Sequence, residues 1–230
     1  GLTQTHQNNM GAFGGPDIIT DGLVFAVDAG STRSYAGSGT TAYNLVANND
    51  VSLINGLGWQ SGNGGYFSSD GTDDGMTTPD ATNLDLVDFT LEGWVWWDQH
   101  KNYGSFLVKG PGGSGQLFNY SFFGYVNQVS FGFGDQSNYR AVYISPPAIN
   151  EWHHIVGTYD GSSLKFYLNS ALANSVSVTA TPNQNNDTLQ ILQSQYSIDG
   201  RIACAKVYNR ALSAAEILQN FNAQKSRFGL

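Results

Sequence analysis

Residues 89–97 read FTLEGWVWW, and this stretch decides the fold. Successive side chains of a β-strand point to opposite faces of the sheet, so the odd-numbered positions from Phe89 to Trp97 share one face. The even-numbered positions from Thr90 to Trp96 share the other face. Because both faces carry large apolar groups, we expect this segment to be a central strand of a layered β protein.

Short apolar runs punctuated by Gly, Asn and Asp recur along the rest of the chain. They predict strands at residues 23–27, 51–54, 66–68, 105–109, 116–123, 128–133, 141–144, 153–159, 164–169, 173–178, 189–192 and 201–208. Asp160-Gly161 is the clearest hairpin signal, because this pair suits the backbone of a tight turn. We therefore predict an all-β fold, a two-sheet antiparallel sandwich.

The C-terminal segment carries the helix signal. Ser213 and Glu216 form a capping box, and Leu212 can pack on Ile217 as a hydrophobic staple. At the other end, residues 1–21 are polar and glycine-rich, and we expect them to form an extended N-terminal arm. Residues 22–230 then form one sandwich domain with a short C-terminal helix and a tail.

The composition narrows the classes of partner. Charged residues make up 12% of the 230 residues, and the formal net charge is −8. The 10 Lys and Arg residues are scattered, so we expect no nucleic-acid partner. No apolar run approaches the ~18 residues of a membrane span, so we expect no membrane partner either. Cys204 is the single cysteine, which excludes an internal disulfide, and its Ala neighbours predict a small buried side chain.

Three blocks resemble, in order, the laminin-G-like domains of the concanavalin A-like lectin/glucanase superfamily. They are DGTDD at 70–74 with FTLEGWV at 89–95, WHHIVGTYDG at 152–161 with LKFYLN at 164–169, and GRI at 200–202 with VYNRALS at 207–213. The resemblance implies a jelly-roll sandwich. One departure stands out, because relatives often carry Asp-Glu where this chain has Ala203 and Cys204.

Two further stretches resemble laminin-G-like virion proteins of tailed phages, especially marine ones. They are GLVFAVDAG at 22–30, which runs on to SY at 34–35 and GSGTT at 37–41, and FNA at 221–223 with RFGL at 227–230. This resemblance implies a capsid decoration or fibre component on the capsid or tail surface, within an oligomeric assembly. We expect the N-terminal arm to bind other virion proteins, such as a capsid protein. Maturation cleavage would fit a chain that begins at Gly1 rather than at Met.

We expect no enzymatic activity and no catalytic residue. Glycan hydrolases of this fold place carboxylates close together on one strand, whereas the only glutamates here, Glu92, Glu151 and Glu216, lie on different segments. His153 and His154 are adjacent on a predicted strand, so they point to opposite faces and cannot share a metal ion. We expect one of these histidines in the core and the other near the surface.

Two sets of residues are candidates for ligand binding. Asp70, Asp73 and Asp74 form the densest acidic cluster, and carboxylate oxygens suit calcium. Asp-Gly turns need no metal, so we favour a plain turn and expect no cofactor, with calcium as the alternative. Tyr103 and Tyr139 lie in predicted loops and are the candidates for stacking on a sugar ring. The other aromatic residues of segments 94–97 and 120–125 are assigned to the core.

These observations favour a non-enzymatic virion structural protein that displays a lectin-like sandwich. The alternative is an extracellular carbohydrate-binding adhesion module, with or without calcium, that binds cell-surface glycans. A glycan hydrolase is the third alternative. The first two are compatible, because a virion protein can display a sugar-binding domain.

Overall fold

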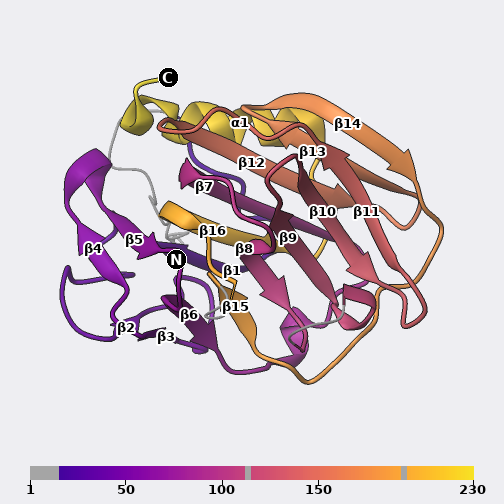
Figure 1. Ribbon diagram of the computed structural model, residues 1–230, viewed down its shortest axis with the longest axis horizontal. Helices are drawn as coiled ribbons and strands as arrows, with labels where there is room; N and C mark the ends of the chain where they lie inside the picture. The colour runs from indigo at the N-terminus through magenta and orange to yellow at the C-terminus, as the bar shows by residue number, and fades with distance from the viewer. Residues whose placement is uncertain (1–15, 112–114, 193–195) are drawn as a thin grey trace, which may run out of the picture.

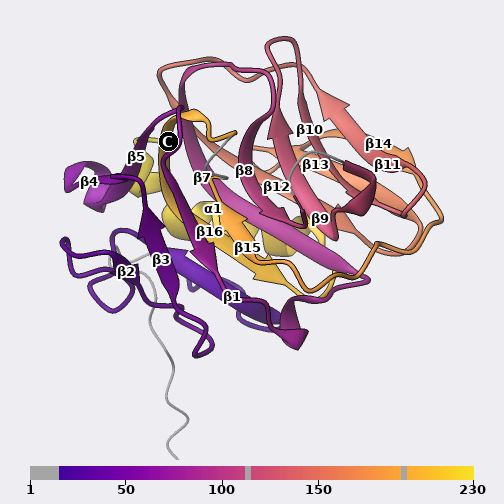
Figure 2. The ribbon, with the colours of Figure 1, turned by 60° about the horizontal axis from the view of Figure 1, so that its bottom comes forward.

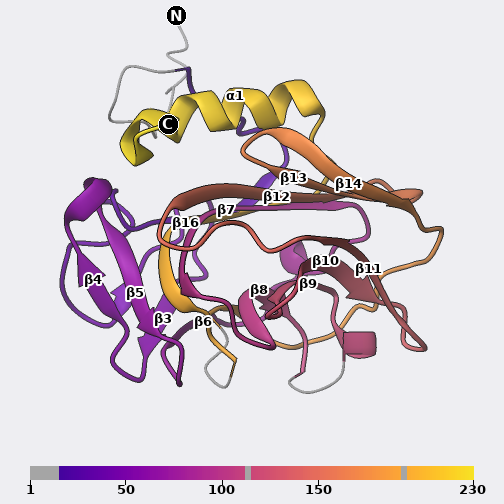
Figure 3. The ribbon, with the colours of Figure 1, turned by 45° about the horizontal axis from the view of Figure 1, so that its top comes forward.

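The computed structural model describes residues 16–111, 115–192 and 196–230. Two eight-stranded antiparallel sheets pack face to face, and helix α1 (Ala214–Gln224) lies across one of them (Figures 1 and 3). The predicted all-β, two-sheet sandwich with a short C-terminal helix is therefore confirmed. Among the described residues, no helix is long and apolar enough to cross a membrane.

The first sheet is the one beneath α1. In spatial order its strands are β14 (Ala171–Ser177), β13 (Ser163–Leu168), β12 (Trp152–Tyr159), β7 (Phe89–Gln99), β16 (Asp199–Tyr208), β5 (Tyr66–Asp70) and β4 (Gly58–Gln60), and β1 (Leu23–Asp28) also pairs with β16. The Asp160-Gly161 turn joins β12 to β13 as predicted, and Gly161 has a φ of 79°.

The second sheet lies in front in Figure 2, with α1 behind the first sheet. Its order is β11 (Tyr139–Ile144), β10 (Val129–Gly134), β9 (Tyr120–Gly124), β8 (Gly104–Lys109), β15 (Leu189–Ile191), β6 (Gly75–Thr78), β3 (Val51–Ile54) and β2 (Thr41–Ala42). The second sheet therefore has one face on the shared core and one face that α1 does not cover.

Strand β7 occupies the central position that its sequence predicts, between β12 and β16. Its odd-numbered side chains enter the core between the sheets, where the ring of Phe89 lies 5.7 Å from that of Phe131 and 6.3 Å from that of Phe133. On the other face of β7, Glu92 and Trp94 are buried beneath α1. The period of two thus separates two distinct interiors.

Helix α1 begins at the predicted capping box. The Ser213 hydroxyl accepts a hydrogen bond from the Glu216 backbone N–H, and the Glu216 carboxylate accepts one from the Ser213 N–H. Arg210 donates two hydrogen bonds to the same carboxylate, at 3.1 and 2.7 Å. Leu212 and Ile217 are buried in one apolar cluster, as a hydrophobic staple requires.

The structure differs from the predicted strands in one long segment and in three short ones. The predicted strand 116–123 is a 3-10 turn, η3 (Gly115–Leu117), followed by β9. The chain turns there because the Asn119 side chain donates to the Leu86 carbonyl and accepts from the Leu86 N–H. Strands β2, β4 and β6 were not predicted. Their two to four residues are too few for an alternating pattern to stand out.

Residues 16–21 of the predicted N-terminal arm lie on α1, and residues 1–15 lie outside the described part of the chain. Ile18 belongs to the apolar cluster beneath the helix. The Ile19 N–H donates to the Asn220 side chain at 2.7 Å, and Gln219 donates to the Asp17 carbonyl at 2.8 Å. The arm is therefore in contact with α1 from Asp17 onward.

Candidate functional site

The outer face of the second sheet is hollowed where small side chains line β9 and β10. Phe122 points into the core, so its neighbours Ser121 and Phe123 point outward. Across the ladder, Ser121 is paired with Gly132 and Phe123 with Ser130. Small residues at three of these four outward positions leave room for the side chain of Tyr139, whose hydroxyl contacts that of Ser121.

Aromatic side chains form the walls of this hollow. It has a volume of about 500 Å³ and is lined by Tyr103, Gly115, Phe118, Phe123, Tyr125, Tyr139 and Tyr196. The Tyr103 ring centroid lies 5.5 Å from that of Tyr125 and 6.1 Å from that of Tyr196. Phe123 lies 6.4 Å from Tyr139 on the other side. We call this hollow the aromatic pocket.

The two tyrosines that the sequence singled out for stacking, Tyr103 and Tyr139, both line this pocket. Tyr139 is the first residue of β11 rather than a loop residue, which corrects its predicted position. Its hydroxyl oxygen lies 2.9 Å from the Ser121 Oγ, so the side chain is tied to β9. The pocket therefore joins residues that are far apart in the sequence.

Tyr103 stands at the mouth of the pocket in an unusual backbone conformation. Its φ is 66°, in the left-handed region where glycine and asparagine are the common residues. The preceding residue, Asn102, accepts a hydrogen bond from the Val126 N–H and so ties this turn to the next. The Tyr103 side chain is 56% exposed. A large ring therefore occupies a turn position that the backbone alone would give to a small residue.

The pocket is electrically neutral but rich in hydroxyl groups. Burial raises the pKa of both Tyr125 and Tyr139, so these phenols stay protonated at neutral pH. The Tyr139 hydroxyl contacts that of Ser121, which is fully buried on β9. None of the described residues that line the pocket carries a charge. The site can stack on an apolar surface and exchange neutral hydrogen bonds.

Sequence reasoning missed the four other aromatic members of the pocket. Phe123 and Tyr125 were assigned to the core, and Phe118 and Tyr196 were not singled out. Phe123 is indeed buried, with 7% of its surface exposed, but on the outer side of the sheet. The alternation of residues 120–123 contains that information, whereas nothing around Tyr196 indicates where it will lie.

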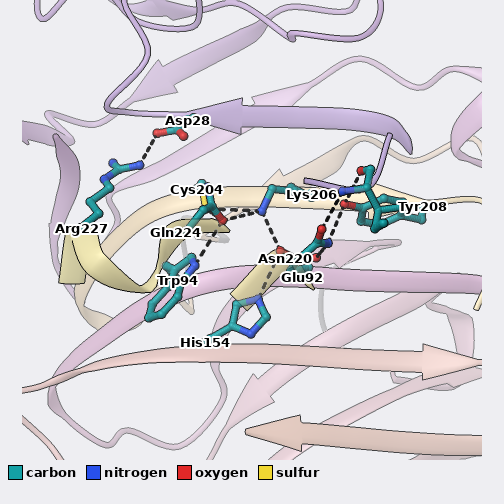
Figure 4. Close-up of polar contacts among 11 residues, drawn as sticks. Asp28, Glu92, Trp94, His154, Cys204, Lys206, Tyr208, Asn220, Gln224 and Arg227 are labelled. Carbon is teal, nitrogen blue, oxygen red and sulfur yellow. Dashed lines mark hydrogen bonds and ion pairs between the residues drawn. The ribbon is translucent and has the colours of Figure 1, made fainter. Parts of the chain in front are cut away.

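The outer face of the first sheet holds a buried charged network instead (Figure 4). The Glu92 carboxylate accepts hydrogen bonds from Lys206 at 2.6 Å and from Asn220 of α1 at 2.6 Å, and it lies 3.2 Å from the His154 ring. Lys206 also donates to Gln224 of α1 at 2.8 Å. Glu92 and His154 are fully buried, so this network fastens the helix to the sheet and is closed to a substrate.

The pKa shifts within this network follow from burial and pairing. Burial by itself raises the pKa of Glu92, but the Lys206 charge and the His154 contact outweigh it and lower the pKa to about 2. Burial lowers the pKa of His154, so its ring is neutral at neutral pH. The charged Glu92–Lys206 pair is thus held by hydrogen bonds beneath α1, beside a neutral His154.

The three glutamates lie apart, as the sequence analysis expected. Glu92 is sealed beneath α1 and Glu216 caps that helix. The Glu151 side chain is 60% exposed and lies 3.5 Å from the His153 ring. None of these three carboxylates is among the described residues that line the aromatic pocket.

The adjacent histidines point to opposite sides, but the expected surface location of one of them is wrong. His153 is only 3% exposed and His154 is fully buried. The His153 ring lies 2.8 Å from the Ala148 carbonyl and packs near Trp97, because the chain after β11 covers that side of β12. Both histidines are therefore structural.

Asp70, Asp73 and Asp74 meet on the turn between β5 and β6, where one oxygen of each lies within 4.8 Å of the others. Asp74 accepts a hydrogen bond from the Asp70 N–H, and Asp70 accepts one from the Thr72 N–H. Burial raises the pKa of Asp74, and the two neighbouring carboxylates raise it further. At least two of the three carboxylates already stabilise the turn itself.

Cys204 is buried as expected, with 1% of its surface exposed. Lys206, two positions further along β16, places its Nζ 3.9 Å from the sulfur. Burial outweighs this charge and raises the pKa of the thiol. A protonated, enclosed thiol of this kind is unreactive.

Solved structures with this fold include toxin binding domains and a sialidase. The receptor binding domain of botulinum neurotoxin C/D mosaic serotype superposes with a TM-score of 0.73 at 13% identity, over 90% of this chain and 52% of that one. The binding domain of Paraclostridial Mosquitocidal Protein 1 gives 0.69 at 16% identity, over 88% and 52%. Trypanosoma rangeli sialidase gives 0.67 at 18% identity, over 92% and 34%. The chain thus spans about half the length of the toxin domains and about a third of the sialidase.

Sequence comparison defines the family. No curated protein sequence matches the chain. The family model of Laminin_G_3, described as the Concanavalin A-like lectin/glucanases superfamily, matches residues 70–218. These residues include β7, β12 and β16, the strands from which the sequence resemblance was drawn. The chain therefore belongs to the laminin-G-like family of the concanavalin A-like lectin/glucanase superfamily.

Proposed function

We propose that this protein is a non-enzymatic, lectin-like module that binds carbohydrate in the aromatic pocket. The pocket itself is the observation that carries the proposal. Ligand sites of this size are commonly lined by aromatic side chains with a few placed polar groups. Sugar rings present apolar C–H faces that pack on aromatic rings, and hydroxyls that can bond to tyrosine hydroxyls such as those that line the pocket.

The fold neighbours support this choice of ligand class. One solved neighbour is the binding domain of botulinum neurotoxin DC in complex with SialylT. Another belongs to botulinum neurotoxin type C, whose cell entry is dependent upon interaction with two ganglioside molecules. At 16% and 15% identity these structures share only the fold with this chain. They support the use of such a sandwich in glycan binding.

The test is a glycan array probed with the whole chain, followed by calorimetry on each positive glycan. Tyr196→Ala removes one pocket wall and should weaken binding about tenfold, the loss of one stacking contact. Tyr43→Ala is the matched control, because Tyr43 is 51% exposed and is not among the residues that line the pocket. Equal losses in the two variants, or no glycan bound, would contradict the proposal.

The non-enzymatic part of the proposal rests on the positions of the carboxylates. A glycosidase needs two carboxyl groups about 5–9.5 Å apart across the sugar, and none of the described residues that line the pocket is acidic. A screen of polysaccharides for released reducing ends should find binding without turnover. Turnover that Glu151→Gln abolishes would favour the hydrolase alternative.

We also propose that binding needs no metal ion. The Asp70 and Asp74 carboxylates accept backbone N–H groups of their own turn, which suits a metal-free turn. Affinity should be equal in EDTA and in calcium. A loss in EDTA that calcium restores, and that Asp73→Asn reproduces, would instead assign calcium to this cluster.

A second, compatible proposal is that the module is displayed on a phage virion, and otherwise that it is extracellular. It is supported by the resemblance of residues 22–41 and 221–230 to phage virion proteins, and by the position of Asp17–Ile19 on α1, across the sandwich from the pocket. Attachment near α1 would leave the pocket free. Deletion of residues 1–15 spares the described contacts of Asp17 and should prevent incorporation into particles. Equal incorporation would contradict this role.

A further inference from the structure

Resting on the proposed function, we infer that the aromatic pocket selects an electrically neutral sugar residue, and that Tyr103 is its specificity-determining platform. Two independent features of the pocket support this. One is the distribution of charged side chains in and near the pocket, and the other is the backbone conformation of Tyr103.

No charged side chain is among the described residues that line the pocket, and the cations nearby already have partners in the fold. Residues 110–134 and 188–198, which contribute five of the seven lining residues, contain no Asp, Glu, Lys, Arg or His in their sequence. Arg140, the neighbour of Tyr139, lies 2.6 Å from the Asp135 carboxylate. Lys109 on β8 is fully buried and binds Asp80 and Asp85 at 2.9 and 2.8 Å. Lys101 donates to the Gly71 carbonyl.

An anionic sugar would therefore enter the pocket without a counter-charge. Carboxylate, sulfate and phosphate groups are recognised mainly by Arg or Lys, and an unpaired charge is costly to remove from water. The net charge of −8 repels such ligands further at low salt. A neutral sugar ring carries no charge to be removed from water or repelled, and it still gains aromatic contact and neutral hydrogen bonds.

The backbone of Tyr103 points to a ligand role for its ring. A tyrosine with a φ of 66° is less stable than asparagine or glycine would be at the same position. Its ring adds little to the core, because it is 56% exposed and contacts the pocket rings of Tyr125 and Tyr196. Strain of this kind persists at binding sites, where the side chain is needed for the ligand.

This combination predicts an unusual variant. Tyr103→Asn removes the ring and relieves the left-handed strain, so its unfolding midpoint should be equal to or higher than that of the wild type. Its affinity for a neutral sugar should fall by about tenfold or more, as expected for the loss of a stacking platform. A residue with a merely structural role would lose stability and binding together. Tyr43→Asn serves as the matched control for both measurements.

The ligand experiment uses matched pairs: neutral oligosaccharides, and the same oligosaccharides carrying a sialic acid, a sulfate or a uronic acid. Calorimetry with the whole chain should show the neutral member bound about tenfold more tightly than its anionic partner, as expected when a charge is left unpaired. Tyr103→Asn should weaken binding of the neutral member by about tenfold or more.

The outcomes separate this inference from the proposed function. If an anionic sugar binds as tightly as its neutral partner and Tyr103→Asn abolishes it, the pocket is a sugar site but the neutral selectivity is wrong. If binding is unchanged in both Tyr103→Asn and Tyr196→Ala, the site is elsewhere and both proposals fail. Binding of a peptide and of no sugar would also overturn both.

Discussion

The outer face of the first sheet carries Glu92, Lys206 and His154 and is covered by α1, whereas the outer face of the second sheet carries Ser121, Ser130 and Gly132 and holds an uncovered pocket. The covered face is charged inside, and its Glu92–Lys206 pair is buried. The uncovered face is neutral and lined with rings. The two faces therefore differ in where their charged side chains lie: the covered face buries them beneath α1, whereas none of the described residues that line the pocket is charged.

The reason lies in the cost of leaving polar groups unpaired. Beneath α1, each carboxylate oxygen of Glu92 has a partner, and Asn220 of the helix supplies one of them, while Gln224 of the helix accepts from Lys206. Such a network fixes the helix in one position, because any shift would leave a buried charge without its partner. In the pocket, neutral hydroxyls can exchange partners with a ligand at little cost.

The largest expected effect comes from breaking the Glu92–Lys206 ion pair beneath α1. Lys206→Met should destabilise the protein by about 3–5 kcal/mol, because it leaves the Glu92 carboxylate buried without its cation. Denaturant unfolding measures this directly. Lys165→Met is the control, since Lys165 pairs with Asp160 at the surface and should cost less than about 1 kcal/mol. Similar midpoints for the two variants would show that the network contributes no more than a surface pair.

The second-largest expected effect is a loss of folding stability at low pH, caused by Glu92 and His154 beneath α1. The folded-state pKa of Glu92, about 2, is lower than its ordinary value of 4.5, so its stabilising contribution is present above pH 4.5 and is lost as the pH falls toward 2. The pKa of His154 is lowered below 6.5, so it also opposes folding as the pH falls below that value. Unfolding midpoints should therefore decline continuously below pH 6.5. NMR titration of the His154 ring at or above pH 6.5 would contradict this.

The helix cap should show a smaller effect. Ser213→Ala removes the acceptor for the Glu216 backbone N–H and should cost about 1 kcal/mol. Ser226→Ala, in the exposed part of the turn η4 (Lys225–Phe228), is the control and should leave the denaturant midpoint nearly unchanged. If Ser213→Ala is as stable as this control, the capping box is not a net stabiliser of the covered face.

The smallest expected effect is on the uncovered face. Because burial raises the pKa of Tyr125 and Tyr139, the pocket should keep one protonation state between about pH 6 and about pH 9. Sugar affinity measured by calorimetry should therefore not change over this pH range, although the unfolding midpoint already declines below pH 6.5. A marked pH dependence would place a titrating group in the site.

The sequence alone determined the elements that depend on neighbouring residues. The alternation of residues 89–97 predicted the central strand and its two faces, and the spacing of Ser213 and Glu216 predicted the start of α1. It also singled out Tyr103 and Tyr139, the two tyrosines that prove to share a pocket. In each case a period of two, a cap, or an aromatic residue beside a turn is visible within a few positions.

Only the tertiary structure decided which of these residues meet. Glu92 and Lys206 are 114 positions apart, and Glu92 and Asn220 are 128 apart, yet all three join beneath the helix. Tyr196 and Phe118 likewise reach the pocket from segments distant from Tyr103 and from each other. The physical reason is that strand order and sheet packing set these contacts. Local patterns show which face a side chain occupies, but not which distant strand will lie beside it.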